Sequence, residues 1–129
     1  MAITLTDNAR NAAANGIVDL IDVGGTGTLE IKSAASTVSG TSEVATLTFQ
    51  ATAFGAAASG TATVTPTMVS DTNAAGGTAG FYTVFDGASA AVWQGLVATS
   101  ASDLNLSSIT IGAGDTVSIS AFTLTVPAS

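Results

Sequence analysis

The amino-acid sequence predicts a mainly β fold, an antiparallel β-sandwich or barrel with one N-terminal α-helix. Apolar residues follow a helical spacing only before Gly24. After Gly27 they alternate with polar residues in short segments separated by Gly, Ser, Asn and Asp. A chain of 129 residues is also the size of one domain with a single core. We therefore expect one domain over residues 1–129, with a helix at about 5–23 and a β-rich region at 27–126.

The helix is expected in the stretch "TDNARNAAANGIVDLID", where Thr6 has the side chain of an N-cap. Asn15 and Gly16, in the middle of the stretch, have low helix propensity and weaken the case for a continuous helix. The spacing of apolar residues predicts one buried stripe, made of Ala9, Ala13, Ile17, Leu20 and Ile21.

A glycine-rich stretch, "DLIDVGGTGTLEI" at Asp19–Ile31, resembles a nucleotide-binding fingerprint. That fingerprint works because a strand leads into a tight turn and then a helix, whose N-terminus binds the phosphate. Here the predicted helix comes first and an alternating segment, residues 28–32, follows the glycines. The lysine of a phosphate-binding loop is also missing. The stretch therefore predicts a turn between a helix and a strand, and no nucleotide cofactor.

Alternation predicts the main strands. Residues 44–50, "VATLTFQ", place Ala45, Leu47 and Phe49 on one face and Thr46 and Thr48 on the other. Phe81–Phe85 and Ala91–Val97 are expected to form a hairpin, with Asp86–Ser89 as its turn. The last segment, "DTVSISAFTLTVPAS", alternates clearly, but its phase slips by one residue at Ala121 and Phe122. A slip reverses the face that each side chain occupies, so we expect a bulge, a sharp bend or a change of sheet there.

Two loops of low complexity, residues 33–43 and 70–80, lack large apolar anchors, and we expect them to be mobile unless a partner orders them. In the second loop, Asp71 and Asn73 carry oxygen ligands suited to calcium. The alternating acids of a calcium-binding loop are missing, so a local turn closed by the Asp71 side chain is the favoured interpretation, and we predict no metal site.

Composition excludes most catalytic chemistry. The chain has no cysteine and no histidine, so it lacks disulfides, thiolate metal ligands and the commonest general base. Asp19 and Asp22 could pair as acid and base, but solvated helix carboxylates are the better interpretation. No serine or threonine has an evident activating base. We therefore expect no enzyme activity, no catalytic residue and no cofactor.

Charge and hydropathy limit the partners. Nine acidic residues outnumber two basic ones, Arg10 and Lys32, and the net charge of −7 opposes binding to nucleic-acid phosphates. No apolar run approaches the length of a membrane span, and the start, "MAITLTDNAR", lacks the pattern of a cleaved secretion signal. We expect a soluble polypeptide that binds neither nucleic acid nor membrane.

Aromatic residues gather in the predicted hairpin, which holds Phe81, the only tyrosine, Tyr82, and the only tryptophan, Trp93. Aromatic side chains grouped in this way are usually core residues, because each buries a large apolar area. The alternative is that part of this aromatic surface packs on another subunit, since aromatic residues are enriched in protein interfaces.

Nearly the whole chain resembles a group of small virion proteins of tailed bacteriophages. The resemblance is carried by "LTDNARNAAANGIVDLIDVGG", "VATLTFQATAFGAAASG", "DTNAAGGTAGFYTVFDG" and "DLNLSSITIGAGDTVSISAFTLTVP". It implies a structural protein, either a capsid decoration (cement) protein or another minor head protein, and it brings no catalytic or ligand-binding residue. The expected partners are the major capsid protein and copies of the chain itself.

The resemblance thus favours a decoration protein on the outer surface of the assembled head, made in the host bacterial cytoplasm. Two alternatives stay open: a component of the tail or of the head-to-tail connector, and a carbohydrate-binding or adhesive surface module. A hydrolase ranks last. Interface candidates are the apolar residues at the start of the chain and the hairpin aromatics, namely Ile3, Leu5, Tyr82 and Trp93.

Overall fold

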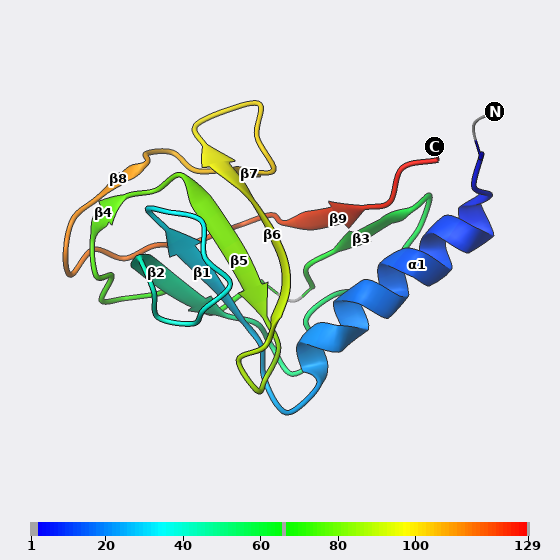
Figure 1. Cartoon of the computed structure of the whole chain (residues 1–129), viewed down its shortest axis with the longest axis horizontal. Coiled ribbons are helices and arrows are strands. Elements are labelled where there is room, and N and C mark those ends of the chain that lie inside the picture. The colour runs from blue at the N-terminus through cyan, green and yellow to red at the C-terminus, as the bar shows by residue number, and fades with distance from the viewer. Residues whose placement is uncertain (1–2, 66, 129) are drawn as a thin grey trace.

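The computed structural model describes residues 3–65 and 67–128, and they fold as a mainly β chain with one N-terminal α-helix, as predicted. Figure 1 shows the arrangement. The elements are α1 (Asp7–Asp19), the 3₁₀ turn η1 (Leu20–Asp22), β1 (Thr28–Lys32), β2 (Glu43–Thr48), β3 (Thr61–Thr63), β4 (Gly77–Thr78), β5 (Phe81–Phe85), β6 (Ala91–Ala98), β7 (Leu104–Asn105), β8 (Thr110–Ile111) and β9 (Thr123–Thr125).

The central sheet has five strands in the order β2-β1-β5-β6-β7 and curls into a half-barrel (Figure 1). Its longer strands pair antiparallel, as expected, and the β5–β6 hairpin lies at the predicted position. The Asp86 side chain closes the hairpin turn by accepting the N–H groups of Ala88 and Ala90, each at 2.9 Å. The last pair, β6 with β7, is parallel over two residues. The fully closed barrel or sandwich stays a prediction.

Two short ladders complete the β structure: β3 pairs with β9, and β4 pairs with β8. The C-terminal segment pairs twice. Val117 first forms a bridge to Asp71, and β9 then pairs with β3. Between these pairings Ile119 and Phe122 are both buried. The predicted irregularity is therefore confirmed as a bend, which lies at Ser120 between the Val117 bridge and β9 and leaves both apolar side chains buried.

The helix begins where the sequence predicts, with the Thr6 hydroxyl accepting the Ala9 N–H at 3.2 Å, and it runs without a break through Asn15 and Gly16. Among the described residues, no helix is long and apolar enough to cross a membrane. After η1, Gly24 and Gly25 turn the chain with positive φ angles of 80° and 125°. Strand β1 then follows, so the predicted order of helix, turn and strand is confirmed.

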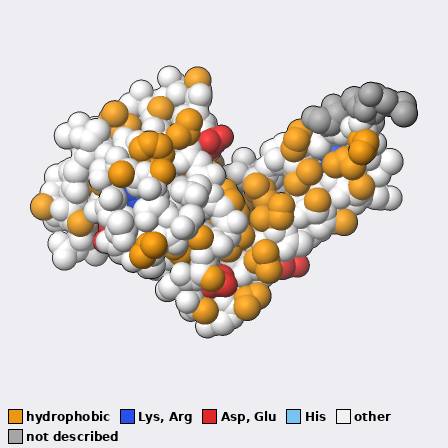
Figure 2. Space-filling view, viewed as in Figure 1, with side chains coloured by type: hydrophobic (Ala, Val, Ile, Leu, Met, Phe, Trp, Pro, Cys, Tyr) orange, Lys and Arg blue, Asp and Glu red, His pale blue; other side chains and the backbone are white. Residues whose placement is uncertain are grey.

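The molecule has two parts, which Figures 1 and 2 show side by side. We call the five-stranded sheet with β4 and β8 the body, and α1 with β3 and β9 the arm, because α1 packs on β3 and β9. One hydrophobic core runs through both parts. Aromatic rings join them: Phe122, just before β9, lies 5.3 Å from Tyr82 of β5 and 6.0 Å from Trp93 of β6, measured between ring centroids.

Candidate interaction surface

The inward face of α1 is held by polar side chains as well as by apolar burial. Ala14 and Val18 are the buried residues of the helix. Beside them, the Asn11 Oδ1 accepts the Gly60 N–H and the Asn15 Oδ1 accepts the Ala57 N–H, each at 2.8 Å. Both asparagines thus satisfy backbone donors of the loop that leads into β3, which explains why residues of low helix propensity stand there.

Arg10 adds a third attachment of the helix, this time to the segment that follows β9. Its Nε donates to the Val126 carbonyl oxygen at 2.8 Å, and its Nη1 lies 3.1 Å from Asp7 Oδ1. Gly60 leaves room for the guanidinium, since a Cβ there would lie 2.6 Å from Arg10 Nε. The basic residue of the helix therefore points inward.

The prediction of one buried apolar stripe on the helix is wrong for its N-terminal residues and holds only near its C-terminal end. Ile21 is fully buried and Ile17 is half-buried, but Ala9, Ala13 and Leu20 are exposed. The polar residues take the inward face because the neighbouring loop presents unpaired N–H groups that need acceptors. Ala9, Ala12 and Ala13 are left exposed on the outer face, while Ala14 and Val18 share the inward face with the asparagines.

We call the surface made by these outward residues the outer strip. Ala9, Ala12, Ala13 and Gly16 of α1 are spaced three, one and three residues apart, and Leu20 follows four residues later in η1, which places these residues on one side of the helix. At the two ends, Ile3 is 78% exposed, Leu20 is 51% exposed and Val23 is 55% exposed. Figure 2 shows hydrophobic side chains along the arm. The strip consists of Ile3, Leu5, Ala9, Ala12, Ala13, Gly16, Leu20 and Val23.

The strip carries no charge between Asp7 and Asp19. Its N-terminal end is fixed, because the Leu5 N–H donates to the Ala128 carbonyl oxygen at 2.6 Å. Two of the four interface candidates, Ile3 and Leu5, therefore lie on an exposed apolar surface. They lie on the arm, away from the other two candidates.

The hairpin aromatics lie mainly in the core. Tyr82 is only 4% exposed, and Trp93 is half-buried against it. The Trp93 Nε1 donates to the Tyr82 hydroxyl oxygen at 3.2 Å, and the indole ring stacks on Phe122 with 10° between the ring planes. The structure thus does not bring Tyr82 and Trp93 together with Ile3 and Leu5.

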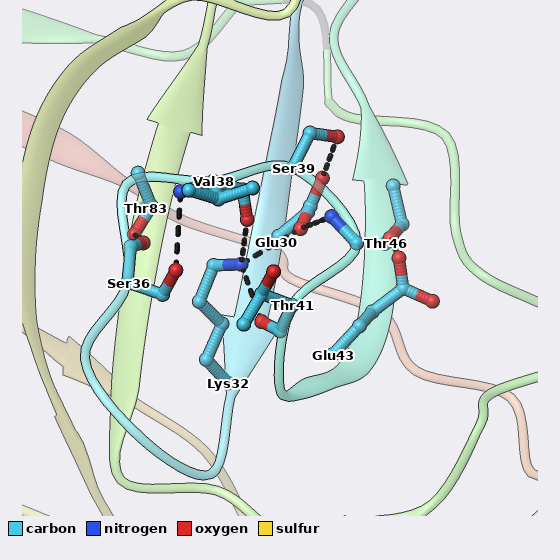
Figure 3. Close-up of polar contacts among 10 residues, drawn as sticks. Glu30, Lys32, Ser36, Val38, Ser39, Thr41, Glu43, Thr46 and Thr83 are labelled. Carbon is cyan, nitrogen blue, oxygen red and sulfur yellow. Dashed lines mark hydrogen bonds and ion pairs between the residues drawn. The ribbon is translucent and has the colours of Figure 1, made fainter.

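A buried ion pair, which the sequence did not reveal, organises the loop at residues 33–42 (Figure 3). Lys32 is fully buried, and its Nζ donates to Glu30 Oε1 at 2.9 Å and to two loop carbonyl oxygens, those of Val38 at 3.0 Å and Thr41 at 2.8 Å. Glu30 also accepts the Ser39 hydroxyl at 2.7 Å. The only signal in the sequence is that Glu30 and Lys32 occupy one face of a strand.

Burial acts to raise the pKa of Glu30, but hydrogen bonds from Ser39, Gly40 and Lys32, together with the Lys32 charge, outweigh it and hold that pKa below its ordinary value. The carboxylate therefore stays charged and anchors the loop. These contacts oppose the mobility expected for residues 33–43, because they tie the loop backbone to two buried side chains.

Of the acidic side chains considered for metal or acid-base chemistry, Asp71 and Asp22 bind the backbone, and Asp19 is exposed. Asp71 Oδ1 accepts the Asn73 N–H at 2.9 Å, so the predicted side-chain turn is confirmed, and its Oδ2 accepts the Thr46 N–H at 2.8 Å. This contact and the buried Ala74 anchor the second loop as well. Asp22 accepts the Ala53 N–H at 3.1 Å. Within residues 3–65 and 67–128, no three metal-ligating side chains converge.

Comparison with known proteins gives no relative, since no family model, curated protein or solved structure matches the chain. The surface with the clearest chemical character is the outer strip. Its function must be inferred from what an uncharged apolar helix face can bind.

Proposed function

We propose that the chain is a structural protein of a bacteriophage virion that decorates the outer surface of the assembled capsid and docks there through the outer strip. The observation that carries the proposal is the orientation of α1. It turns Arg10, Asn11 and Asn15 inward, and it leaves Ala9, Ala12 and Ala13 exposed on the outer side, with Leu20 exposed directly after the helix. In a helix whose outer face meets only solvent, polar side chains lie outside and apolar side chains lie inside.

Burial of the strip on a partner is favourable for two reasons. Single exposed apolar side chains are ordinary, but a continuous apolar surface marks an interaction site. Ala9, Ala13 and Gly16 are small, so a partner backbone can approach the helix closely, and a Cβ added at Gly16 would meet nothing within 4 Å. No charged side chain has to be desolvated along this part of the helix.

The assignment to a phage capsid depends on the sequence resemblance. A protein that contacts neighbouring capsid subunits binds only the assembled shell, so its binding free energy opposes disassembly. Weak contacts suffice, because they are repeated over the whole lattice. A tail or connector component would use the same kind of surface but would not follow the lattice of the head.

The direct test is a virion reconstruction combined with a heat-stability comparison of particles that have or lack the protein. We expect density for the chain on the outside of the head in lattice copy number, and lower heat resistance of particles that lack it. Density on the tail alone would overturn the decoration role. Density on the head with unchanged heat resistance would overturn the stabilising mechanism.

The docking surface is tested with purified chain and particles that lack it. Ala13→Glu places a charge in the centre of the outer strip, and Ala35→Glu makes the same change at an exposed alanine of the body loop. We expect Ala13→Glu to abolish co-sedimentation with particles and Ala35→Glu to leave it intact. Equal binding of both variants would exclude the strip as the docking surface.

A further inference from the structure

A groove lies between the body and the arm, where Figure 2 shows the molecule hollowed. Two adjoining cavities form it, one of about 580 Å³ between the β7 region and the segment before β9, and one of about 390 Å³ between β6 and β9. They share Asp103 and Thr123, so together they make one continuous depression. Each is of a size that small organic ligands occupy in proteins.

The polar lining of the groove consists mostly of neutral groups that both donate and accept hydrogen bonds. Gln94 and Asn105 contribute amides, and hydroxyls come from serines and from Thr123 and Thr125. Asp103 is the one carboxylate in the lining, and neither lysine nor arginine lines it. With a net charge of −7, the chain would repel an anionic ligand from such a site.

The rest of the lining is apolar and rigid. Trp93 faces the smaller cavity and is fixed by its stack on Phe122 and by its hydrogen bond to Tyr82. Tyr82 also lines that cavity. Burial raises the pKa of Tyr82; the hydrogen bond from Trp93 opposes this shift, and the Asp103 charge adds to it. The phenol therefore keeps its proton, and its hydroxyl oxygen holds the Trp93 indole in place.

Two of the polar groups are held in place by the backbone. Asp103 Oδ2 accepts the Leu96 N–H at 2.9 Å, and Asn105 Oδ1 accepts the Ser102 N–H at 3.1 Å. Each keeps further hydrogen-bonding capacity for a ligand, since a carboxylate has a second oxygen and an amide has its NH₂ group. A ligand would thus meet preorganised partners, which lowers the entropy cost of binding.

We propose that this groove binds a neutral oligosaccharide. A sugar ring has apolar C–H faces and a rim of hydroxyls, which matches an aromatic and aliphatic floor bordered by amide, hydroxyl and carboxylate groups. The rim hydroxyls are both donors and acceptors, like most of the side chains that line the groove. The site goes beyond capsid docking, because none of its lining residues belongs to the outer strip.

An extended peptide is the competing ligand. In the described structure β7 covers the outer edge of β6 only at Val97 and Ala98, so the backbone near Gln94 could pair with an added strand. The oligosaccharide is favoured because the groove continues past β6 to the hydroxyl-rich segment at Ser118 and Ser120, which offers side chains rather than a strand edge.

The test uses the full chain and its single tryptophan, which lines the groove. The fluorescence of Trp93 is recorded while neutral hexasaccharides (maltohexaose, cellohexaose, mannohexaose and chitohexaose) are added separately, and calorimetry measures each affinity. A heparin hexasaccharide and a hexapeptide of serine and threonine are titrated in the same way. We expect saturable binding of at least one neutral sugar and none of the heparin fragment.

Thr123→Val removes a hydroxyl shared by both cavities with little change of shape, and Thr78→Val makes the same change on β4, outside the groove. The first should weaken sugar binding about tenfold, which corresponds to one hydrogen bond, and the second should leave it unchanged. Absence of binding to all four sugars, binding of the peptide alone, or equal affinity of both variants would overturn the proposal. Because the isolated chain is used, failure here leaves the capsid proposal intact.

Discussion

At the scale of single residues, the Glu30–Lys32 pair is the most consequential polar contact in the described structure. Both side chains are buried and fully hydrogen-bonded, so removal of one partner leaves the other charge without compensation. The sequence could not reveal this, because a strand lysine next to a loop is ordinarily solvated. Its burial depends on the carbonyl oxygens that the following loop folds over it.

Glu30→Gln is expected to lower the free energy of unfolding by about 3–5 kcal/mol, because the Lys32 ammonium stays buried without a carboxylate. The double variant Glu30→Gln with Lys32→Met should recover much of that loss. Urea denaturation measures both. As a control, Asp7→Asn breaks the exposed pair with Arg10 and should cost no more than about 1 kcal/mol. A double variant less stable than the single one would contradict this account.

The same pair predicts an acid transition. Because the pKa of Glu30 in the folded chain lies below its ordinary value of 4.5, ionisation of Glu30 stabilises the fold above about that pH. The contribution is lost as pH falls through the lowered folded pKa. We expect the double variant to lose less stability than the wild type between pH 5 and the acid transition, measured by urea titrations at each pH. Parallel pH profiles would show that other carboxylates cause the loss.

At the scale of elements, α1 shows what a sequence can and cannot predict. Its cap at Thr6 and its position before the glycine turn follow from the sequence and are confirmed, but the α-helix is shorter than the predicted 5–23, because residues 20–22 form a 3₁₀ turn. The buried face does not follow, because alanine is compatible with either side of a helix and the inward asparagines pair with a loop far along the chain. Local spacing contains no information about those loop N–H groups.

Asn15→Ala should therefore destabilise the chain although alanine is the better helix former. The Ala57 N–H would lose its acceptor, at a cost of about 1–3 kcal/mol, and the gain in helix propensity offsets less than about 0.7 kcal/mol of it. Asn8→Ala, at an exposed helix position, gains the propensity without that loss and should be neutral or stabilising. Thermal unfolding of the two variants compares them, and equal shifts would exclude the tether.

Two glycines test how tightly the helix and the sheet meet. A Cβ at Gly27 would lie 2.3 Å from Ile21 Cγ2 and 2.5 Å from the Phe85 carbonyl oxygen, whereas one at Gly16 would meet nothing within 4 Å. Gly16→Ala should raise the unfolding free energy by about 0.5–1 kcal/mol, since it favours the helix. Gly27→Ala should lower it, because the buried backbone would have to move. Melting temperatures that shift in the same direction would contradict the packing.

The strands follow the alternation of the sequence more closely than the sites do. β5, β6 and the change of sheet near Phe122 lie where the pattern predicts them. The short parallel pairing of β7 has no such signal, because two residues cannot establish a period. The groove is equally hidden from the sequence, since its walls come from β6, the β7 region and the segment before β9.

At the scale of the whole molecule, the arm and the body present two surfaces of different chemistry. The outer strip is apolar and uncharged along the helix, and the groove is polar with an aromatic floor. They share no residue, although α1 and β9 are in contact within the arm. Attachment through the strip would therefore leave the lining of the groove free to bind a ligand.

This separation predicts that the two activities are lost independently. Ala13→Glu should abolish particle binding and keep sugar binding, because the new carboxylate lies on the outer strip, whereas Thr123→Val should do the reverse. Co-sedimentation with particles and Trp93 fluorescence measure the two activities on the same preparations, and circular dichroism checks that both variants are folded. Loss of both activities in a folded variant would show that the strip and the groove form one coupled site. The two surfaces would then contact a single sugar-bearing partner instead of two separate partners.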